Sequence, residues 1–132
     1  MKEVYETRLK EILEISQHLL KNGFEPDMWT GDYCYKSTMF TSIKDKRFTT
    51  GHGEYETFNQ PFMTLNRALE LLPRVIRVDN RKYDIEMFDN SDGFTFWYTN
   101  GYILLQEDEH DPHLAALRLL KQVVEKGYLK NG

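Results

Sequence analysis

The chain has 132 residues, of which 40% are hydrophobic, 14% aromatic and 29% charged, and its formal net charge is −4. This length and composition fit a single domain over residues 1–132 with one core, and they argue against disorder along the whole chain. The negative net charge argues against non-specific nucleic-acid binding, although it does not exclude a local basic patch.

The only cysteine is Cys34, so no intramolecular disulfide can form. The acidic start of the chain does not have the basic and apolar pattern of a signal peptide. No apolar run approaches the roughly 20 residues that cross a bilayer. We therefore expect a cytoplasmic protein that does not contact a membrane, and no motif indicates a cofactor.

The first predicted element is an amphipathic helix over residues 3–22, whose apolar residues recur at helical spacing. Gly23 is expected to end it, with Phe24 packing back on Leu19 as in a Schellman C-cap. Residues 25–32 read as a loop. Residues 33–41 and 48–50 are rich in β-branched and aromatic residues and predict two strands, joined through a charged turn at 44–47.

A second helix is expected over residues 59–72, with Asn59 as its N-cap and Phe58 packing on Met63. Pro73 should stop it, because proline cannot donate the next helical hydrogen bond. The last helix begins at Asp111, an N-cap followed by proline at the first helical position, and should close at Gly127.

Between these helices, residues 83–88, 94–99 and 102–106 predict a three-stranded antiparallel meander with turns at 90–93 and 100–101. Alternation should turn Asp84 and Glu86 outward. The residues expected to pack together on the helix side are Tyr83, Ile85 and Met87 of the strand and Leu117, Leu120 and Val124 of the last helix. The order αββαβββα predicts the α+β class, with an antiparallel sheet of four to five strands and helices packed mainly on one face.

Several short motifs in the second half of the chain resemble those of a known group of proteins. They are Leu-Leu-Pro at 71–73, Val-Asp-Asn at 78–80, Lys-Tyr at 82–83, Gly-Phe-Thr-Phe-Trp-Tyr at 93–98 and Lys-Gly-Tyr at 126–128. Over roughly residues 65–130 the chain resembles small uncharacterised proteins encoded by phages and prophages of gut-type bacteria. The resemblance implies an accessory protein that acts by binding inside a bacterial cell.

Charge is distributed unevenly, since residues 84–111 hold eight acids and no lysine or arginine. Acids on strands that also carry aromatic side chains favour docking to a basic site on another protein, because charge speeds encounter and aromatics supply affinity. The alternative is a solvated face that maintains solubility. The protein-binding residues that this hypothesis selects are Asp84, Glu86, Asp89, Asp92, Trp97, Tyr102, Glu107, Asp108 and Glu109.

A second hypothesis is single-stranded nucleic-acid binding by residues 33–48, where aromatic and basic side chains interleave. Its candidate residues are Tyr35, Lys36, Lys44, Lys46 and Arg47. The same pattern also describes a strand with a core face and a solvated turn.

A third hypothesis is a small metal-dependent or histidine-based hydrolase. His52 lies between two glycines beside Glu54, while His110 and His113 flank Asp111 in an acidic segment. Adjacent residues rarely converge on one ion, so the favoured interpretation is a helix cap at Asp111 and no metal. The main hypothesis is thus a non-enzymatic protein-interaction module, whose partner, process and oligomeric state no motif encodes.

Overall fold

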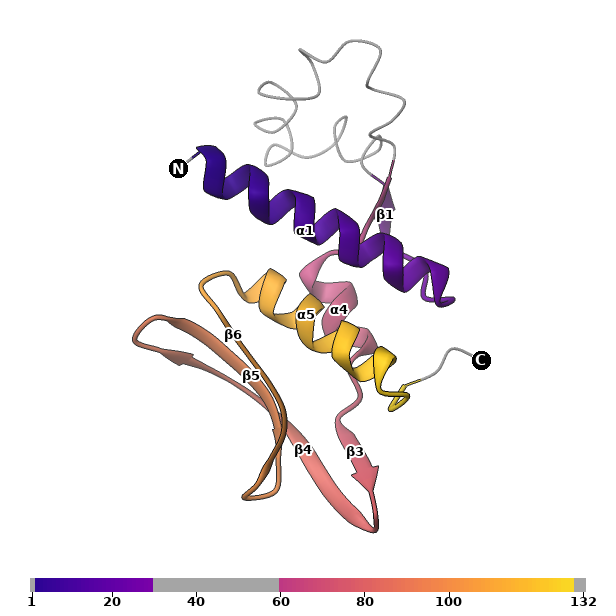
Figure 1. Cartoon of the computed structure of the whole chain (residues 1–132), viewed down its shortest axis with the longest axis vertical. Helices are drawn as coiled ribbons and strands as arrows, with labels where there is room; N and C mark the ends of the chain where they lie inside the picture. The colour runs from indigo at the N-terminus through magenta and orange to yellow at the C-terminus, as the bar shows by residue number, and fades with distance from the viewer. Residues whose placement is uncertain (1, 30–59, 130–132) are drawn as a thin grey trace.

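The computed structural model describes residues 2–29 and 60–129, which form three helices and two antiparallel sheets (Figure 1). The elements in chain order are α1 (Lys2–Lys21), β1 (Met28–Trp29), β2 (Pro61–Phe62), α4 (Leu65–Leu71), β3 (Val75–Val78), β4 (Arg81–Asn90), β5 (Gly93–Thr99), β6 (Ile103–Glu109) and α5 (Pro112–Glu125). The α+β class and the grouping of strands are confirmed. The strands predicted at 33–41 and 48–50 lie outside the described residues.

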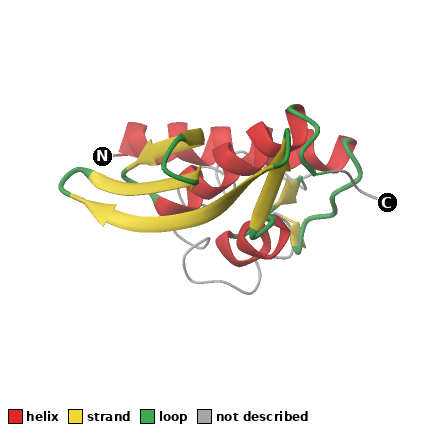
Figure 2. Cartoon of the chain, turned by 90° about the horizontal axis from the view of Figure 1, so that it is seen from below, coloured by secondary structure: helices red, strands yellow, loops and turns green. Residues whose placement is uncertain are grey.

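Helix α5 lies at the centre of the described structure. It packs against β5 and β6 on one side and against α1 and α4 on others. Figure 2, viewed at right angles to Figure 1, shows the strands of the larger sheet curling across the helices. A helix enclosed in this way needs apolar residues around most of its surface. Seven of its fourteen residues are buried: Leu114, Ala115, Ala116, Leu117, Leu119, Leu120 and Val123.

Two Schellman caps end the long helices, as the glycines predict. In α1, the Phe24 N–H donates to the Leu19 carbonyl at 3.0 Å, and Gly23 has a φ of 92°. In α5, the Tyr128 N–H donates to the Val123 carbonyl at 2.9 Å. Positive φ at these positions is adopted without strain only by glycine. None of the helices in residues 2–29 and 60–129 combines the length and apolar character that crossing a membrane requires.

The second helix begins later than predicted. Thr64 caps it by accepting the Arg67 N–H at 3.2 Å, and residues 61–62 form a strand instead. The extended chain there is held by α1, because the buried Ser16 hydroxyl accepts the Met63 N–H at 2.9 Å. This contact joins residues that are 47 positions apart in sequence, and it overrides the helical pattern predicted for the residues before Thr64. The predicted cap at Asn59 lies outside the described residues, whereas the stop before Pro73 is confirmed.

The larger sheet has the order β3-β4-β5-β6, so the predicted meander is present and gains one strand. The added strand β3 joins β4 through a two-residue turn in which Asp79 and Asn80 have φ values of 52° and 67°. Two consecutive positive φ values make a hairpin turn of the I′ kind, which matches the twist of paired strands.

The predicted faces of β4 are confirmed. Ile85 lies opposite the fully buried Tyr98, while Glu86 lies opposite Trp97 and is exposed. Met87 is on the same face as Ile85, but its predicted packing against the last helix is wrong, because Met87 is 52% exposed. Its exposure follows from the position of α5, which lies over β5 and β6, whereas the β4–β5 turn projects to one side of it (Figure 1).

Candidate protein-binding face

The acidic residues of the meander do not share one face. We call the sheet face that contacts α5 the inner face and the opposite one the outer face. Strand pairing aligns Glu86, Trp97 and Gln106 on the outer face and Met87, Phe96 and Glu107 on the inner face. By alternation, Asp84, Glu86 and Asp108 are outer, Asp89, Glu107 and Glu109 are inner, and Asp92 lies in the β4–β5 turn. The candidate acids are therefore divided between the two faces of the sheet and the β4–β5 turn.

The inner acids at the end of β6 are used within the fold. The Arg118 guanidinium of α5 donates to Glu109 of β6 at 2.8 Å and, through two nitrogens, to both carboxylate oxygens of Glu11 in α1 at 2.5 and 2.7 Å. This bidentate contact lowers the pKa of Glu11 and raises that of Arg118. One arginine thus connects both long helices to the sheet.

Glu107 is also engaged by α5, since its carboxylate accepts the Gln122 side-chain amide. It is half-buried, and burial raises its pKa despite the opposing effects of Arg118 and Gln122. Glu107 and Glu109 therefore bond within the fold and are less available to a partner than the outer acids. Strand alternation from the buried Leu105 would have placed both inward, had the predicted strand extended beyond residue 106.

The centre of the outer face is an aromatic pair. The Trp97 indole N–H donates to the Glu86 carboxylate at 2.7 Å. The Phe88 ring meets Trp97 edge to face, with 5.1 Å between ring centroids and an interplanar angle of 64°. Glu86 and Phe88 are both exposed. The pair therefore offers an ordered apolar surface beside a carboxylate.

Next to this pair, a chain of hydrogen bonds runs across three strands. Asn90 donates to the Thr95 hydroxyl at 2.6 Å, Thr95 donates to Asp108, and Gln106 donates to Asp108 at 2.8 Å. Thr95 is only 3% exposed. Both carboxylate oxygens of Asp108 are thus occupied within the sheet, which leaves Asp84 and Glu86 as the outer acids most open to a partner.

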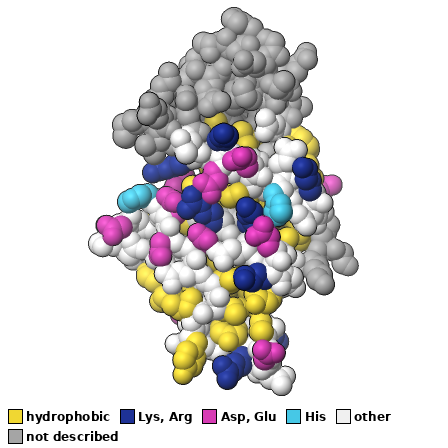
Figure 3. Space-filling model, in the orientation of Figure 1, with side chains coloured by type: hydrophobic (Ala, Val, Ile, Leu, Met, Phe, Trp, Pro, Cys, Tyr) yellow, Lys and Arg dark blue, Asp and Glu magenta, His cyan; other side chains and the backbone are white. Residues whose placement is uncertain are grey.

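Exposed apolar side chains concentrate on the meander. Of the five large exposed hydrophobic residues in the described chain, only Trp29 lies elsewhere. The other four are Met87 (52%), Phe88 (40%), Tyr102 (75%) and Ile103 (52%). Figure 3 shows hydrophobic side chains gathered over the lower part of the molecule, where Figure 1 places the sheet. Met87 and Phe88 lie near the β4–β5 turn on opposite faces, whereas Tyr102 and Ile103 lie at the β5–β6 turn, so the four residues do not form one continuous patch.

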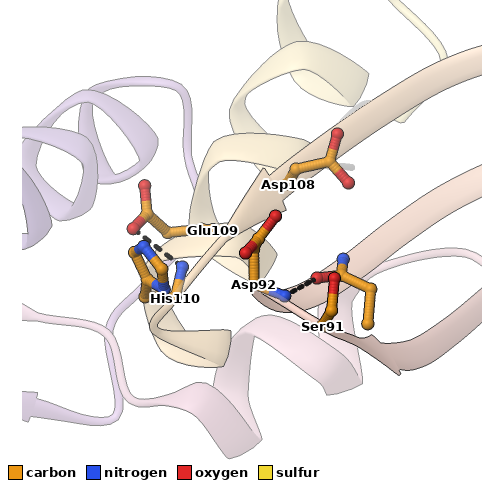
Figure 4. Close-up of a pocket in the computed structure, with 6 residues that line it drawn as sticks. Ser91, Asp92, Asp108, Glu109 and His110 are labelled. Atoms are coloured by element: carbon orange, nitrogen blue, oxygen red, sulfur yellow. Dashed lines mark hydrogen bonds between the residues drawn. The ribbon is translucent and has the colours of Figure 1, made fainter.

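A hollow of about 500 Å³ lies between the β4–β5 turn and the end of β6. Figure 4 shows its lining residues, which are Asn90, Ser91, Asp92, Asp108, Glu109 and His110. The Asn90 side chain accepts the Asp92 N–H at 2.7 Å, and Glu109 accepts the His110 N–H at 2.9 Å. Among the described residues, no three metal-ligating side chains converge, here or elsewhere.

The two histidines of the acidic segment have different surroundings. The His113 ring donates through Nε2–H to the Met63 carbonyl at 2.7 Å and lies edge-on to Phe62. Asp111 caps α5 by accepting the His113 N–H at 3.0 Å, as predicted. His110 is exposed in the hollow, so His110 and His113 do not form a common site. His52 and the nucleic-acid candidates Tyr35, Lys36, Lys44, Lys46 and Arg47 lie outside the described residues.

Comparisons with family models, curated proteins and solved structures returned no match to this chain. The resemblance to phage and prophage proteins therefore stays a prediction. A function for this chain has to be inferred from the geometry of the outer face itself.

Proposed function

We propose that this chain is a non-enzymatic protein-interaction module that binds another protein through the outer face of its β4–β6 meander. The observation that carries the proposal is the ordered pair Trp97 and Phe88, which lies beside Glu86 on a sheet face that no described element covers. Aromatic side chains at the centre of a patch with charged residues around them are typical of binding surfaces.

The partner surface that fits this face is apolar at its centre and basic around it. An arginine of the partner can lie over the Trp97 ring and pair with Glu86. Asp84 adds a second carboxylate, which is 4.0 Å from Lys82 and otherwise exposed. The accessory role in a bacterial cell that the resemblance implies is consistent with such a module and forms part of the proposal.

The experiment compares two double charge reversals. The outer-face variant Asp84→Lys/Glu86→Lys and the control Glu14→Lys/Glu70→Lys change the net charge equally. Each set includes one residue in a surface ion pair, since Asp84 pairs with Lys82 and Glu70 pairs with Arg67 at 3.6 Å. Such pairs contribute about 0–1 kcal/mol, so both variants should keep the wild-type circular dichroism spectrum.

Tagged wild type and both variants are used to capture proteins from a bacterial lysate, and a recovered protein is then purified and titrated against all three. We expect the control to retain binding and the outer-face variant to weaken it about tenfold or more, because two attractive contacts become repulsive. Equal affinity of the two variants, or no partner specific to the wild type, contradicts the proposal.

A further inference from the structure

The second half of β4 is paired on one side only. Strand β3 pairs with β4 from Val78 opposite Arg81 to Val75 opposite Asp84. The last contact on that side is the Ile85 N–H, which donates to the Arg74 carbonyl at 3.1 Å. From residue 86 to residue 90, β4 is bonded to β5 alone, and no described strand lies along its other edge.

Strand geometry identifies the backbone groups at this open edge. In a strand, the N–H and C=O of alternate residues point to the same side. Since the Ile85 N–H points toward β3, the backbone groups of Met87 and Asp89 point the same way, whereas those of Phe88 point to β5. Met87 and Asp89 therefore present two donors and two acceptors at the open edge.

The side chains of this segment are also open on both faces. All five residues from 86 to 90 are exposed, including Met87 on the inner face and Phe88 on the outer face. The other sheet edge, β6, is different because Glu107 and Glu109 point inward and bond to α5. Inward-pointing charges protect an edge against strand addition. Residues 86–90 contain one such charge, Asp89, but it does not bond to α5 as Glu107 and Glu109 do, and the segment has no proline or lysine.

We propose that an extended basic peptide segment of the partner adds to the sheet beside residues 86–90, in line with β3. The inference rests on the proposed function, because the same hairpin carries the aromatic pair. Cross-strand neighbours define the segment: a lysine or arginine next to Glu86 and Asp89, and apolar residues next to Met87 and Phe88. The pattern basic-apolar-apolar-basic reads the same in either strand direction.

Charge selects this occupant over a second copy of the chain. Pairing two copies along the edge would place the Glu86 and Asp89 carboxylates of both copies on adjacent strands, and residues 84–111 hold no lysine or arginine to pair with them. Like charges on adjacent strands are destabilising, whereas opposite charges are favourable. The acids thus oppose self-association and attract a basic segment.

The direct test mixes the full chain with a synthetic peptide that has the core Lys-Val-Ile-Lys. Fluorescence anisotropy measures binding, and amide hydrogen exchange measures the protection of individual backbone amides. We expect saturable binding that weakens as salt rises, with new protection at the Met87 and Asp89 amides. The Phe88 amide, already bonded to β5, should change little. A peptide with glutamates in place of both lysines should not bind. Unchanged exchange at Met87 and Asp89, or equal binding of the acidic peptide, overturns the proposal.

Two substitutions at one position separate the backbone from the side chain. Met87→Pro removes the N–H at the open edge, where proline is tolerated because that group does not bond to β5. Met87→Ala keeps the N–H and shortens the side chain. We expect Met87→Pro to bind the peptide about tenfold or more weakly than Met87→Ala does. Equal affinities contradict strand addition, and if Met87→Pro unfolds, the exchange result on the wild type decides.

The same variants separate this inference from the proposed function. If Asp84→Lys/Glu86→Lys loses the purified partner while Met87→Pro keeps it, the outer face binds and strand addition is wrong. If neither loses it, both proposals fail. Light scattering measures whether the chain forms dimers. A dimer of the wild type that is absent in Met87→Pro would show that a second copy pairs at this edge, and it would overturn the proposal that a basic peptide binds there.

Discussion

Two pairs of acids on one sheet have opposite surroundings. Glu107 and Glu109 lie on the inner face, where α5 supplies Gln122 and Arg118 as partners. Asp84 and Glu86 lie on the outer face in contact with Lys82 and Trp97, and their side chains stay exposed. In sequence the two pairs look alike, since each contains acids two residues apart in one acidic block. The strand and the face determine what each carboxylate does, so local charge density does not define a binding surface.

The largest expected contrast comes from adjacent residues on opposite faces of β5. Tyr98 is fully buried, and its hydroxyl donates to the Pro73 carbonyl at 2.6 Å. Tyr98→Ala should lower the free energy of unfolding by roughly 3–5 kcal/mol, as expected for removing a buried aromatic. Trp97→Ala should cost about 1–2 kcal/mol, because Trp97 is only partly covered. Urea unfolding followed by circular dichroism measures both, and equal losses would contradict the difference between the faces.

A second contrast uses neighbours in β4. Ile85→Asp places a carboxylate opposite the buried Tyr98 without a partner and should cost on the order of 2–3 kcal/mol. Glu86→Lys changes an exposed residue and should alter stability by less than about 1 kcal/mol, including loss of the bond to Trp97. Thermal unfolding midpoints compare the two. A lower midpoint for Glu86→Lys than for Ile85→Asp would mean that the faces are reversed.

A third contrast tests Arg118, which bonds Glu109 of the inner face and Glu11 of α1. Arg118→Met keeps most of the side-chain volume but leaves Glu11 and Glu109 without their guanidinium partner, so we expect a loss of about 1–3 kcal/mol. The control is Arg67→Met in α4, whose arginine bonds the Glu25 carbonyl and pairs with exposed Glu70. The control should cost about 1 kcal/mol or less. Similar losses in both would show that the Arg118 network adds nothing beyond a surface contact.

Much of the fold follows from local sequence signals. The glycines at 23 and 127, the cap at Asp111 and the alternation of β4 each act within a few residues, and the structure confirms each. Strand β3 is absent from the predicted elements although Val75, Ile76 and Val78 have the β-branched character of a strand. The turn after it uses Asp79 and Asn80 without a glycine, which weakens the usual hairpin signal.

The candidate site is less predictable, because it depends on contacts between distant residues. Arg118 meets Glu11 across 107 positions, and Ser16 holds Met63 across 47. Strand periodicity can assign a residue to a face, but it cannot indicate which part of a sheet a helix covers. The exposure of Met87 can therefore be predicted only once the position of α5 is known.

The smallest expected effects are those of pH on Glu11 of α1 and Glu107 of β6, and they have opposite signs. Hydrogen bonding to Arg118 lowers the pKa of Glu11 below its usual 4.5, so the folded state favours the ionised form. Its contribution is present above pH 4.5 and is lost as pH falls through the lowered pKa. Glu11→Gln should therefore lower the unfolding midpoint at pH 7, by an amount equivalent to about 1 kcal/mol or less, and have little effect near pH 3.

For Glu107, burial raises the pKa above 4.5, so folding favours the protonated form. The contribution of Glu107 is present below pH 4.5 and is lost as pH rises through the raised pKa. Glu107→Gln should thus raise the unfolding midpoint slightly at pH 7, because an uncharged amide is less costly to bury than a carboxylate, and should match the wild type near pH 3. The two variants are compared by thermal unfolding at pH 7 and pH 3 in the same buffer salt. If both variants lower the unfolding midpoint at pH 7, the prediction for Glu107 is wrong. The ionised Glu107 would then be stabilised by Arg118 and Gln122 more than it is destabilised by burial.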